Sequence, residues 1–305
     1  MPFKKTLIVF VGPTAIGKTS VAVKIAGHYQ TEIISADSRQ FYRELNAGTA
    51  KPSEAELNHV KHHFINSLSI HDSYSVGQFE IDSLARLDQL FIAHDVVVAV
   101  GGSGLFIDVL CHGLNQLPES DPDLRRELKI LFEEKGLDAL QLKLSQLDPE
   151  YYEDVDLSNP HRLIRAIEVC MLTGKKYSDF RKNEKKKRTF STIKIGLEDE
   201  RSVVYQRINE RVDAMINAGL LEEAKEFFSF RHLNALKTVG YQELFDCLDK
   251  KLSLDEAIEL IKRNTRRYAK RQLTWFRRDQ EINWFKTDEA TKIIELLDQK
   301  INDFN

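Results

Sequence analysis

A phosphate-binding pattern lies at Gly12–Thr19 (GPTAIGKT), which fits G-x-x-x-x-G-K-S/T at every required position. In this pattern the glycines let successive backbone amides approach phosphate oxygens, and the start of a helix adds partial positive charge. Lys18 supplies a full charge to the terminal phosphate, and the Thr19 hydroxyl is a ligand for Mg²⁺. The pattern predicts a site for a di- or triphosphate, as in ATP-binding proteins, but it does not define the reaction.

A carboxylate follows the second strand-like segment. The run Ile33–Asp37 (IISAD) ends in an acid, whereas the later run Asp95–Val100 (DVVVAV) leads into Gly101 and Gly102. An acid at the carboxyl end of the strand beside a phosphate loop lies at the ligand crevice of an open α/β sheet. Asp37 can there accept a proton from a nucleophile or hold Mg²⁺ through water. A capping or turn aspartate is the alternative.

Strand and helix patterns alternate around these residues. Short runs rich in β-branched residues, typical of buried parallel strands, occur at Thr6–Val11, Glu32–Ser35 and Asp95–Val100. A helical pattern follows the phosphate loop from Lys18 to about Tyr29. The alternation predicts an α/β fold with a parallel sheet, similar to that of P-loop NTPases.

The pattern changes at about residue 115. Asp121 is a candidate N-cap with Pro122 at the first helical position, and 123–180 is helical with no strand candidate. The later segments are a strand at Ser191–Gly196, helices over 200–277, a strand at Ile282–Phe285 and a helix at Asp288–Phe304. We therefore expect three parts: the first part of the core at 1–114, a helical insertion domain at 115–190, and the mostly helical second part of the core at 191–305.

The net charge of −3, from 44 basic and 47 acidic residues, hides an uneven distribution. Residues 262–278 hold eight basic residues and no acid, and residues 181–188 hold six basic residues and one acid. Such asymmetry indicates a polyanionic partner better than the total does. For residues 181–188 a solvated loop is an equal alternative.

The C-terminal basic segment has a helical pattern with two faces. One face is a stripe of apolar or ring-bearing residues continued by two polar ones, namely Ile258, Ile261, Thr265, Tyr268, Gln272 and Trp275. Arg263, Arg267 and Arg271 step by four along another face. We expect the stripe, including Trp275, to pack on the core, and the arginines to contact phosphates or to lie in solvent.

The remaining composition excludes other classes. The three cysteines lie far apart, and the first apolar run has only six residues, too short for a signal-peptide core or a membrane span. We expect a cytoplasmic protein with reduced thiols and no membrane association. His59, His62 and His63 lie near a strand-like Phe64–Asn66 without a thiol or carboxylate at ligand spacing, so core or surface histidines are expected rather than a metal site.

Several runs, in order along nearly the whole chain, resemble the tRNA dimethylallyltransferase family (isopentenyl-diphosphate:tRNA transferases), in particular its bacterial members. These runs are GPTAIGKT at 12–19, DS at 37–38, GTAKP at 48–52, GGSGL at 101–105, HRLIRAIEV at 161–169, RINERV at 207–212, VGY at 239–241 and NTRRYAKRQLTWFRR at 264–278. GTAKP and RRYAKRQLTWFRR are far more specific than the phosphate loop alone.

The resemblance implies transfer of a dimethylallyl group from dimethylallyl diphosphate to N6 of the adenosine at tRNA position 37, beside the anticodon. The phosphate loop would hold the leaving diphosphate with Mg²⁺ as cofactor, and Asp37 would be the base. Because a base cannot reach N6 within a base stack, the adenosine must be flipped into the crevice. The expected partners are dimethylallyl diphosphate and the anticodon stem-loop of tRNA, which the insertion would clamp, and the chain is expected to be a monomer.

The resemblance also implies residue roles. The residues expected in catalysis are Asp37, Lys18, Thr19 and Ser103, with Thr19 also a ligand of Mg²⁺. The diphosphate would be bound by Gly12, Pro13, Thr14, Ala15, Ile16, Gly17, Lys18, Thr19 and Arg211. The tRNA would be contacted by Asp37, Ser38, Arg39, Gln40, Ser103, Arg125, His161, Arg162, Leu163, Ile164, Arg165, Lys237, Thr238, Val239, Gly240, Tyr241 and Gln242.

Some positions depart from the family pattern. Ile16 replaces a common serine in the phosphate loop, Phe106 replaces a tyrosine, and Ser103 replaces a threonine. Arg39 and Gln40 stand where small or apolar residues are frequent, and Arg39 could strengthen a phosphate contact. These departures bear on substrate preference more than on reaction class.

Three other functions remain as alternatives. A P-loop kinase of a small metabolite would use Asp37 to activate a hydroxyl, but it does not explain the basic helix or the GTAKP run. A non-catalytic RNA-binding protein would not need an intact phosphate loop. A transferase acting on free adenine nucleotides would need neither the insertion nor a surface that holds tRNA.

Overall fold

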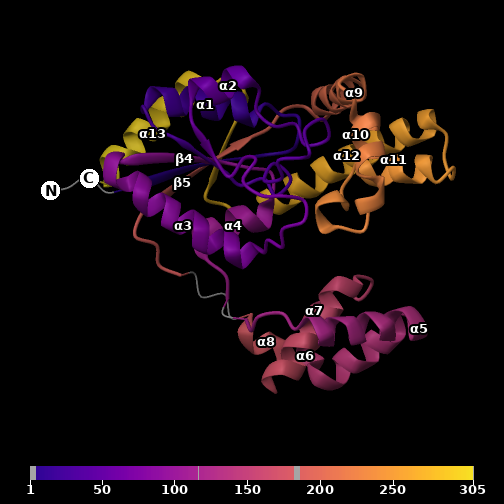
Figure 1. Ribbon diagram of the computed structural model, residues 1–305. Helices are drawn as coiled ribbons and strands as arrows, with labels where there is room; N and C mark the ends of the chain where they lie inside the picture. Colours follow the sequence, from indigo (N-terminus) through magenta and orange to yellow (C-terminus); the bar gives the residue numbers. More distant parts are fainter. Residues whose placement is uncertain (1–4, 116, 182–185, 305) are drawn as a thin grey trace. The chain divides into compact units, whose positions relative to one another are not determined.

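The computed structural model describes residues 5–115, 117–181 and 186–304. The chain forms two compact units (Figure 1), which we call the sheet unit (residues 1–111 and 188–305) and the helical unit (residues 112–187). The insertion expected at 115–190 differs from the helical unit by three residues at each end. Within the described ranges, no helix is both long enough and apolar enough to cross a membrane.

The sheet unit contains six parallel strands in the order β3-β2-β4-β1-β5-β6. The central strand β1 (Thr6–Val11) pairs with β4 (Val96–Val100) on one side and with β5 (Ser191–Leu197) on the other. The outer strands are β2 (Ile33–Ser35), β3 (His62–His63) and β6 (Ile282–Phe285). The predicted α/β class with a parallel sheet is confirmed.

Helices cover both faces of this sheet (Figure 1). Ile8 and Phe10 of β1 pack in a core with α1 (Lys18–His28) and α13 (Ala290–Phe304). The alternate β1 residues, Leu7, Val9 and Val11, pack in a second core with α3 (Val76–Ala93) and α4 (Gly104–His112). A strand buried on both faces in this way reads as a continuous apolar run, as TLIVFV does. The short helix α2 (Glu54–His59) precedes β3.

A group of helices in the sheet unit has a core of its own. It comprises α9 (Arg201–Asn217), α10 (Leu220–Glu226), α11 (Tyr241–Leu248), α12 (Leu254–Phe276) and the 3₁₀ turns η1 (Phe228–Phe230) and η2 (Asn234–Leu236). The helix α12 begins at a capping box formed by Ser253 and Glu256. Along α12, Ile261 packs in this core, whereas Ala269 and Phe276 pack in the two cores of the sheet. One helix therefore links the helical group to the sheet.

The helical unit comprises α5 (Pro122–Leu147), α6 (Pro149–Asp154), α7 (Pro160–Thr173) and α8 (Tyr177–Phe180). Asp121 caps α5 with Pro122 at its first position, as predicted, and α5 kinks at Gly136, whose φ of 76° suits glycine. The buried core of this unit is formed mainly by α5 and α7 and includes Leu128, Leu140, Leu144, Leu163 and Ile167.

One predicted strand is wrong in position. The strand-like Phe64–Asn66 is not a strand, and β3 consists instead of His62 and His63. Phe64 and Asn66 have φ angles of 62° and 54°, in the left-handed region that an extended strand cannot contain. The side chain of His63 bonds to Glu32, and that of His62 bonds to the carbonyl of Val60.

Candidate active site

Two adjoining cavities lie in the sheet unit, where the loops after β1, β2 and β4 meet. The smaller cavity has a volume of about 190 Å³ and is lined by the phosphate loop, and the larger has a volume of about 430 Å³. Because the carboxyl ends of parallel strands lie at one edge of a sheet, residues far apart in the chain converge here. Residues that line both cavities define a junction, and they are Thr14, Ala15, Asp37, Thr49, Arg211 and Tyr268. We call the two cavities together the crevice.

The phosphate loop has the backbone geometry that its sequence requires. A Cβ on Gly12 would lie 2.5 Å from the carbonyl oxygen of Leu197, so only glycine fits there. Gly17 has a φ of 96°, in the left-handed region, immediately before α1. Ile16 is buried in the core of the sheet unit, which explains why an apolar residue can replace the usual serine.

Two cations converge on the smaller cavity. The Lys18 ammonium donates a hydrogen bond to the carbonyl of Pro13 at 2.8 Å. Burial lowers the pKa of Lys18 to about 8, an effect that Asp37 opposes and Arg211 enhances. Burial also lowers the pKa of Arg211, against the effect of Asp37. Among the residues that the structure describes, Arg211 has no hydrogen-bond or ion-pair partner, so its donors are available to an anion in the crevice.

Asp37 lies at the junction, directly after β2 and Ala36. One carboxylate oxygen accepts a hydrogen bond from the amide of Arg39 at 3.0 Å, which fixes the turn, while the side chain still lines both cavities. Asp37 therefore stabilises the turn and also lines the crevice. Ser103 accepts a hydrogen bond from the amide of Ser38 at 3.2 Å, so the loops after β2 and β4 are joined beside Asp37.

Tyr268 of α12 completes the junction. Desolvation of its hydroxyl, followed by the charge of Asp37, raises the pKa of Tyr268 to about 12. The group therefore stays protonated at neutral pH and can donate a hydrogen bond. The sequence pattern alone places Tyr268 in the packing stripe of its helix and does not indicate this position.

Gln272 connects the phosphate loop to the loop after β4. Its carboxamide oxygen accepts a hydrogen bond from the amide of Thr14, and its nitrogen donates to the carbonyl of Gly102, both at 2.8 Å. A Cβ on Gly102 would lie 2.4 Å from this nitrogen. Gln272 is buried, so these bonds are shielded from water. The helical stripe contained this residue but gave no sign of its role.

Glu223 fixes the GTAKP run, although no sequence pattern singled it out. Its carboxylate accepts hydrogen bonds from the amides of Asn46, Ala47 and Gly48, at 2.8, 3.0 and 3.2 Å, and from the hydroxyl of Tyr241. A Cβ on Gly48 would lie 2.5 Å from the Tyr241 ring. Since Gly48 lines the larger cavity, this network positions part of the crevice wall.

The larger cavity has a mainly apolar wall formed by α4, α9, α10, α12 and the 238–240 loop. Its apolar members are Leu105, Phe106, Ile208, Val212, Met215, Leu220, Val239, Ile261 and Trp275. The α12 stripe expected to pack on the core therefore lines the crevice over much of its length. Trp275, expected in the core, is partly exposed to the larger cavity, and its indole nitrogen donates to Asp108 at 3.1 Å.

The residues expected to contact tRNA divide into several groups. Those that line the crevice are Asp37, Ser38, Arg39, Gln40, Ser103, Thr238, Val239 and Gly240. Lys237 and Gln242 are exposed nearby in the chain, and His161 and Arg162 are exposed on the helical unit. Tyr241, Leu163 and Ile164 are buried, and the expectation that they contact tRNA stays a prediction.

Arg39 has a structural role that the sequence did not indicate. Its guanidinium donates to the carbonyls of Asn234, Ala235 and Lys237, at 3.0, 3.2 and 3.3 Å. These bonds hold the η2 turn against the loop that follows Asp37. The expected phosphate contact would thus use only the donors that remain.

Each basic segment has some charges in ion pairs. In the C-terminal segment, Lys262 pairs with Asp213 and Glu259, and Arg277 pairs with Glu198. Arg263, Arg267 and Arg271 are exposed on α12, and none of the described acidic residues forms an ion pair with them. In the other segment, Arg181 pairs with Asp154, and Arg188 pairs with Glu80 at 3.0 Å. Residues 182–185 of that segment lie outside the described residues.

Comparisons with known proteins place the chain in a family. Residues 40–279 match the family model described as IPP transferase. The chain is 55% identical to the tRNA dimethylallyltransferase of Christiangramia forsetii, over 97% of this chain and 98% of that protein. It is 48% identical to tRNA dimethylallyltransferase 1 of Bacteroides fragilis, over 97% and 99% of the two chains. A crystal structure of a tRNA isopentenylpyrophosphate transferase from Bacillus halodurans matches with a TM-score of 0.73 and 36% identity, over 99% of this chain and 98% of that one.

The Lys18 pKa predicts a pH dependence of anion binding. Because the pKa in the free protein is about 8, Lys18 is charged below that pH, and above it an anion can bind fully only if Lys18 takes up a proton. The affinity for an alkyl diphosphate should therefore fall by up to about tenfold per pH unit above pH 8. Isothermal titration across this range measures it. Lys18→Arg, which stays charged, should flatten the profile, and an unaltered affinity of the wild-type chain up to pH 10 would contradict the prediction.

The hydrogen bonds of Glu223 imply that residues 46–48 lose order when its carboxylate is replaced. Glu223→Gln leaves part of the amide array of residues 46–48 without an acceptor, so we expect a loss of about 2 kcal/mol in the free energy of unfolding. Hydrogen exchange should also become faster at these three amides. Tyr241→Phe, which removes one bond and keeps the ring, should have a smaller effect, and Glu222→Gln at the exposed neighbouring position serves as control. Unchanged exchange at residues 46–48 in Glu223→Gln would show that the carboxylate does not hold the loop.

Proposed function

The chain belongs to the IPP transferase family, and from this membership we propose that it transfers a dimethylallyl group from dimethylallyl diphosphate to N6 of the adenosine at tRNA position 37. It is a transferase, and tRNA is its substrate. The products are N6-dimethylallyladenosine in tRNA and free diphosphate. The observation that carries the proposal is the meeting of a polar phosphate-loop cavity and a larger apolar cavity at Asp37 and Arg211.

In this proposal the diphosphate occupies the smaller cavity. Lys18, Arg211 and the amides of the phosphate loop surround it there. An allylic C–O bond breaks more easily when the charge that develops on the leaving group is stabilised by fixed donors. Arg211 and Lys18 meet this requirement, since among the described residues neither forms a hydrogen bond or ion pair with an acidic side chain that it would have to leave before it binds the ligand.

The smaller cavity also suits Mg²⁺. Mg²⁺ prefers oxygen ligands, and the hydroxyl of Thr19 and the carboxylates of Asp37 and Glu56 all line this cavity. Thr19 would hold the ion beside the diphosphate. When bound, the ion would neutralise charge on the leaving group.

In this proposal, the target adenine enters the larger cavity after flipping out of its stack. There N6 attacks the allylic carbon, the bonding electrons of the C–O bond leave with the diphosphate, and one N6 proton passes to Asp37. The position of Asp37 in both cavities supports its role as base, and the Arg39 amide fixes its orientation. Trp275 and Phe106 supply flat apolar surfaces in the same cavity.

The proposal includes how the rest of the chain contributes. The exposed arginines of α12 would contact tRNA phosphates, and the helical unit would clamp the anticodon arm. The enzyme is proposed to act as a monomer. We propose that it works in the cytoplasm, where its tRNA substrate is present.

A transfer assay tests the proposed function. The protein is incubated with unmodified tRNA, Mg²⁺ and dimethylallyl diphosphate labelled in the allyl group, with ATP and AMP as competing acceptors. We expect the label in tRNA, on the base at position 37. Label only in AMP would indicate a transferase for free nucleotides. Transfer of the γ-phosphate of ATP instead would indicate a kinase.

If Asp37 is the base, its replacement should lower turnover without weakening the binding of dimethylallyl diphosphate. Asp37→Asn should lower turnover by about a hundredfold or more, because a positioned base contributes on that scale. Binding of dimethylallyl diphosphate should persist or tighten, since a negative charge beside Lys18 and Arg211 is removed. Asp88→Asn, at an exposed position of α3, is the matched control. Turnover within a few fold of the wild-type value would rule out Asp37 as the base.

A further inference from the structure

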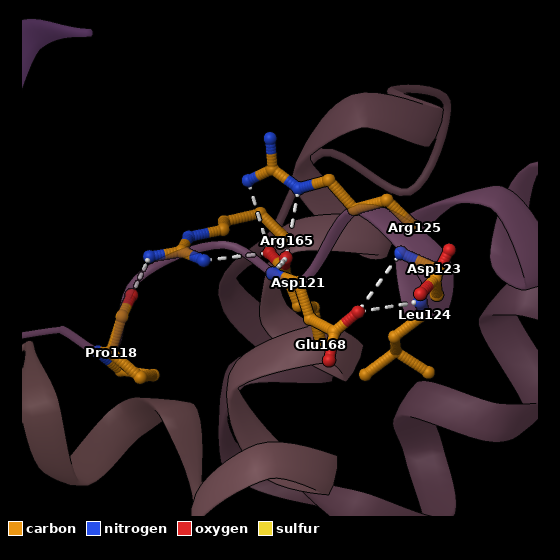
Figure 2. Close-up of polar contacts among 7 residues, drawn as sticks. All are labelled: Pro118, Asp121, Asp123, Leu124, Arg125, Arg165 and Glu168. Atoms are coloured by element: carbon orange, nitrogen blue, oxygen red, sulfur yellow. Dashed lines mark hydrogen bonds and ion pairs between the residues drawn. The ribbon is translucent and has the colours of Figure 1, made fainter.

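A buried carboxylate in the helical unit holds two arginines. Glu168 of α7 is 0% exposed, and its oxygens accept hydrogen bonds from Nε and Nη2 of Arg125 at 2.9 and 3.0 Å. It also accepts one from Nη1 of Arg165 at 2.6 Å (Figure 2). Arg125 lies in the first turn of α5, so the carboxylate joins the two helices that form the core of this unit.

Backbone contacts hold the same cluster in place. Glu168 accepts a hydrogen bond from the amide of Asp121 at 2.9 Å, and Arg165 donates to the carbonyl of Pro118 at 2.8 Å. The Asp121 side chain in turn caps α5 (Figure 2). The two guanidinium groups are therefore fixed in orientation before any ligand arrives, which lowers the entropy that binding must overcome.

Arg125 and Arg165 retain N–H donors that these hydrogen bonds do not use. Each guanidinium has five N–H groups, and Arg125 and Arg165 each use two of them in these bonds. The Arg125 side chain is 40% exposed and that of Arg165 is 25% exposed. The two guanidinium groups exceed the Glu168 carboxylate that they bind by one positive charge, and the Asp121 carboxylate beside them is engaged by the amides of α5. Oriented guanidinium groups of this kind suit the oxygens of a phosphate.

We propose that Glu168 is a positioning residue for tRNA, which aligns Arg125 and Arg165 as one binding site for a backbone phosphate. This inference rests on the proposed function, since it takes tRNA as the ligand. Glu168 is buried and touches no RNA, yet it would control the affinity for RNA through the two arginines. His161 and Arg162, exposed in the first turn of α7, extend the same basic surface.

The direction in which Glu168→Gln changes the affinity for tRNA distinguishes alignment of the two arginines from simple charge attraction. Glu168→Gln removes a negative charge beside the two arginines, so simple electrostatic attraction predicts tighter RNA binding. Alignment predicts the opposite, because a carboxamide can accept through only one of its two ends and the second arginine loses its partner. A residue that served only to stabilise the helical unit would leave the affinity of the folded protein unchanged.

The test measures the dissociation constant of unmodified tRNA over a range of salt concentrations, for the full chain and for Glu168→Gln. We expect about tenfold weaker binding, with a salt dependence shallower by about one phosphate contact. Turnover at saturating tRNA and the affinity for dimethylallyl diphosphate should stay at wild-type values. Glu127→Gln, an exposed acid of α5, is the matched control and should bind tRNA at least as tightly as the wild-type chain. Equal or tighter tRNA binding by Glu168→Gln would overturn the proposal.

A second variant decides the matter if Glu168→Gln does not fold. Arg125→Lys keeps the charge but cannot form the two bonds to Glu168, so it should also weaken tRNA binding severalfold. Arg126→Lys, at the exposed adjacent position whose partner is Asp123, should bind as the wild-type chain does. Wild-type affinity in Arg125→Lys would overturn the proposal. If the unaltered chain binds tRNA but modifies no adenosine, the proposed function fails while this inference stands, and if it binds no tRNA, both fail.

Discussion

A single buried carboxamide, that of Gln272, connects the loops that follow the two central strands β1 and β4. It accepts from the Thr14 amide of the phosphate loop and donates to the Gly102 carbonyl. Its own helix, α12, also supplies Tyr268 to the junction and Trp275 to the larger cavity. The exposed arginines of the same helix face solvent. Through this residue the phosphate loop and the loop after β4 are joined to one helix, which also carries the arginines that we propose contact RNA.

Two carboxylates outside the crevice act in a similar way. Glu223 satisfies three successive backbone amides and the Tyr241 hydroxyl, and Glu168 satisfies two guanidinium groups and one amide. Neither has a place in the proposed chemistry, yet each fixes groups that would meet a substrate. Glu168 is fully buried and Glu223 partly buried, and a carboxylate removed from water is costly unless its partners are complete. In both cases the partners are groups that the proposed function places beside a substrate.

The sequence predicted the features that depend on local pattern. Short runs of residues, read without knowledge of their distant contacts, predict the phosphate loop, the position of Asp37 and the parallel sheet. Gln272 and Glu223 could not be found in this way, because the backbone groups that they bind lie 170 to 258 residue positions away in the chain. The α12 stripe shows a different limit. Helical spacing places residues on one face, but it cannot tell whether that face meets a core or a cavity.

The resemblance to a family has a limit of its own, since it assigned whole segments to tRNA. The structure separates their side chains: Arg162 is exposed, whereas Leu163 and Ile164 pack in the core of the helical unit. The predicted strand at Phe64–Asn66 failed for a similar reason, because an apolar composition does not reveal the left-handed φ angles of Phe64 and Asn66. Burial and backbone conformation are properties of the folded chain, and they decide which residues of a recognised segment can meet a ligand.

The account depends on the two cavities holding the two substrates on either side of Asp37. The most direct measurement is a crystal structure with an unreactive thio analogue of dimethylallyl diphosphate and an anticodon stem-loop. We expect the diphosphate between Lys18 and Arg211, with the flipped adenine in the larger cavity and its N6 about 2.6–3.2 Å from an Asp37 oxygen. A diphosphate bound outside the phosphate loop, or an adenine whose N6 points away from Asp37, would contradict it.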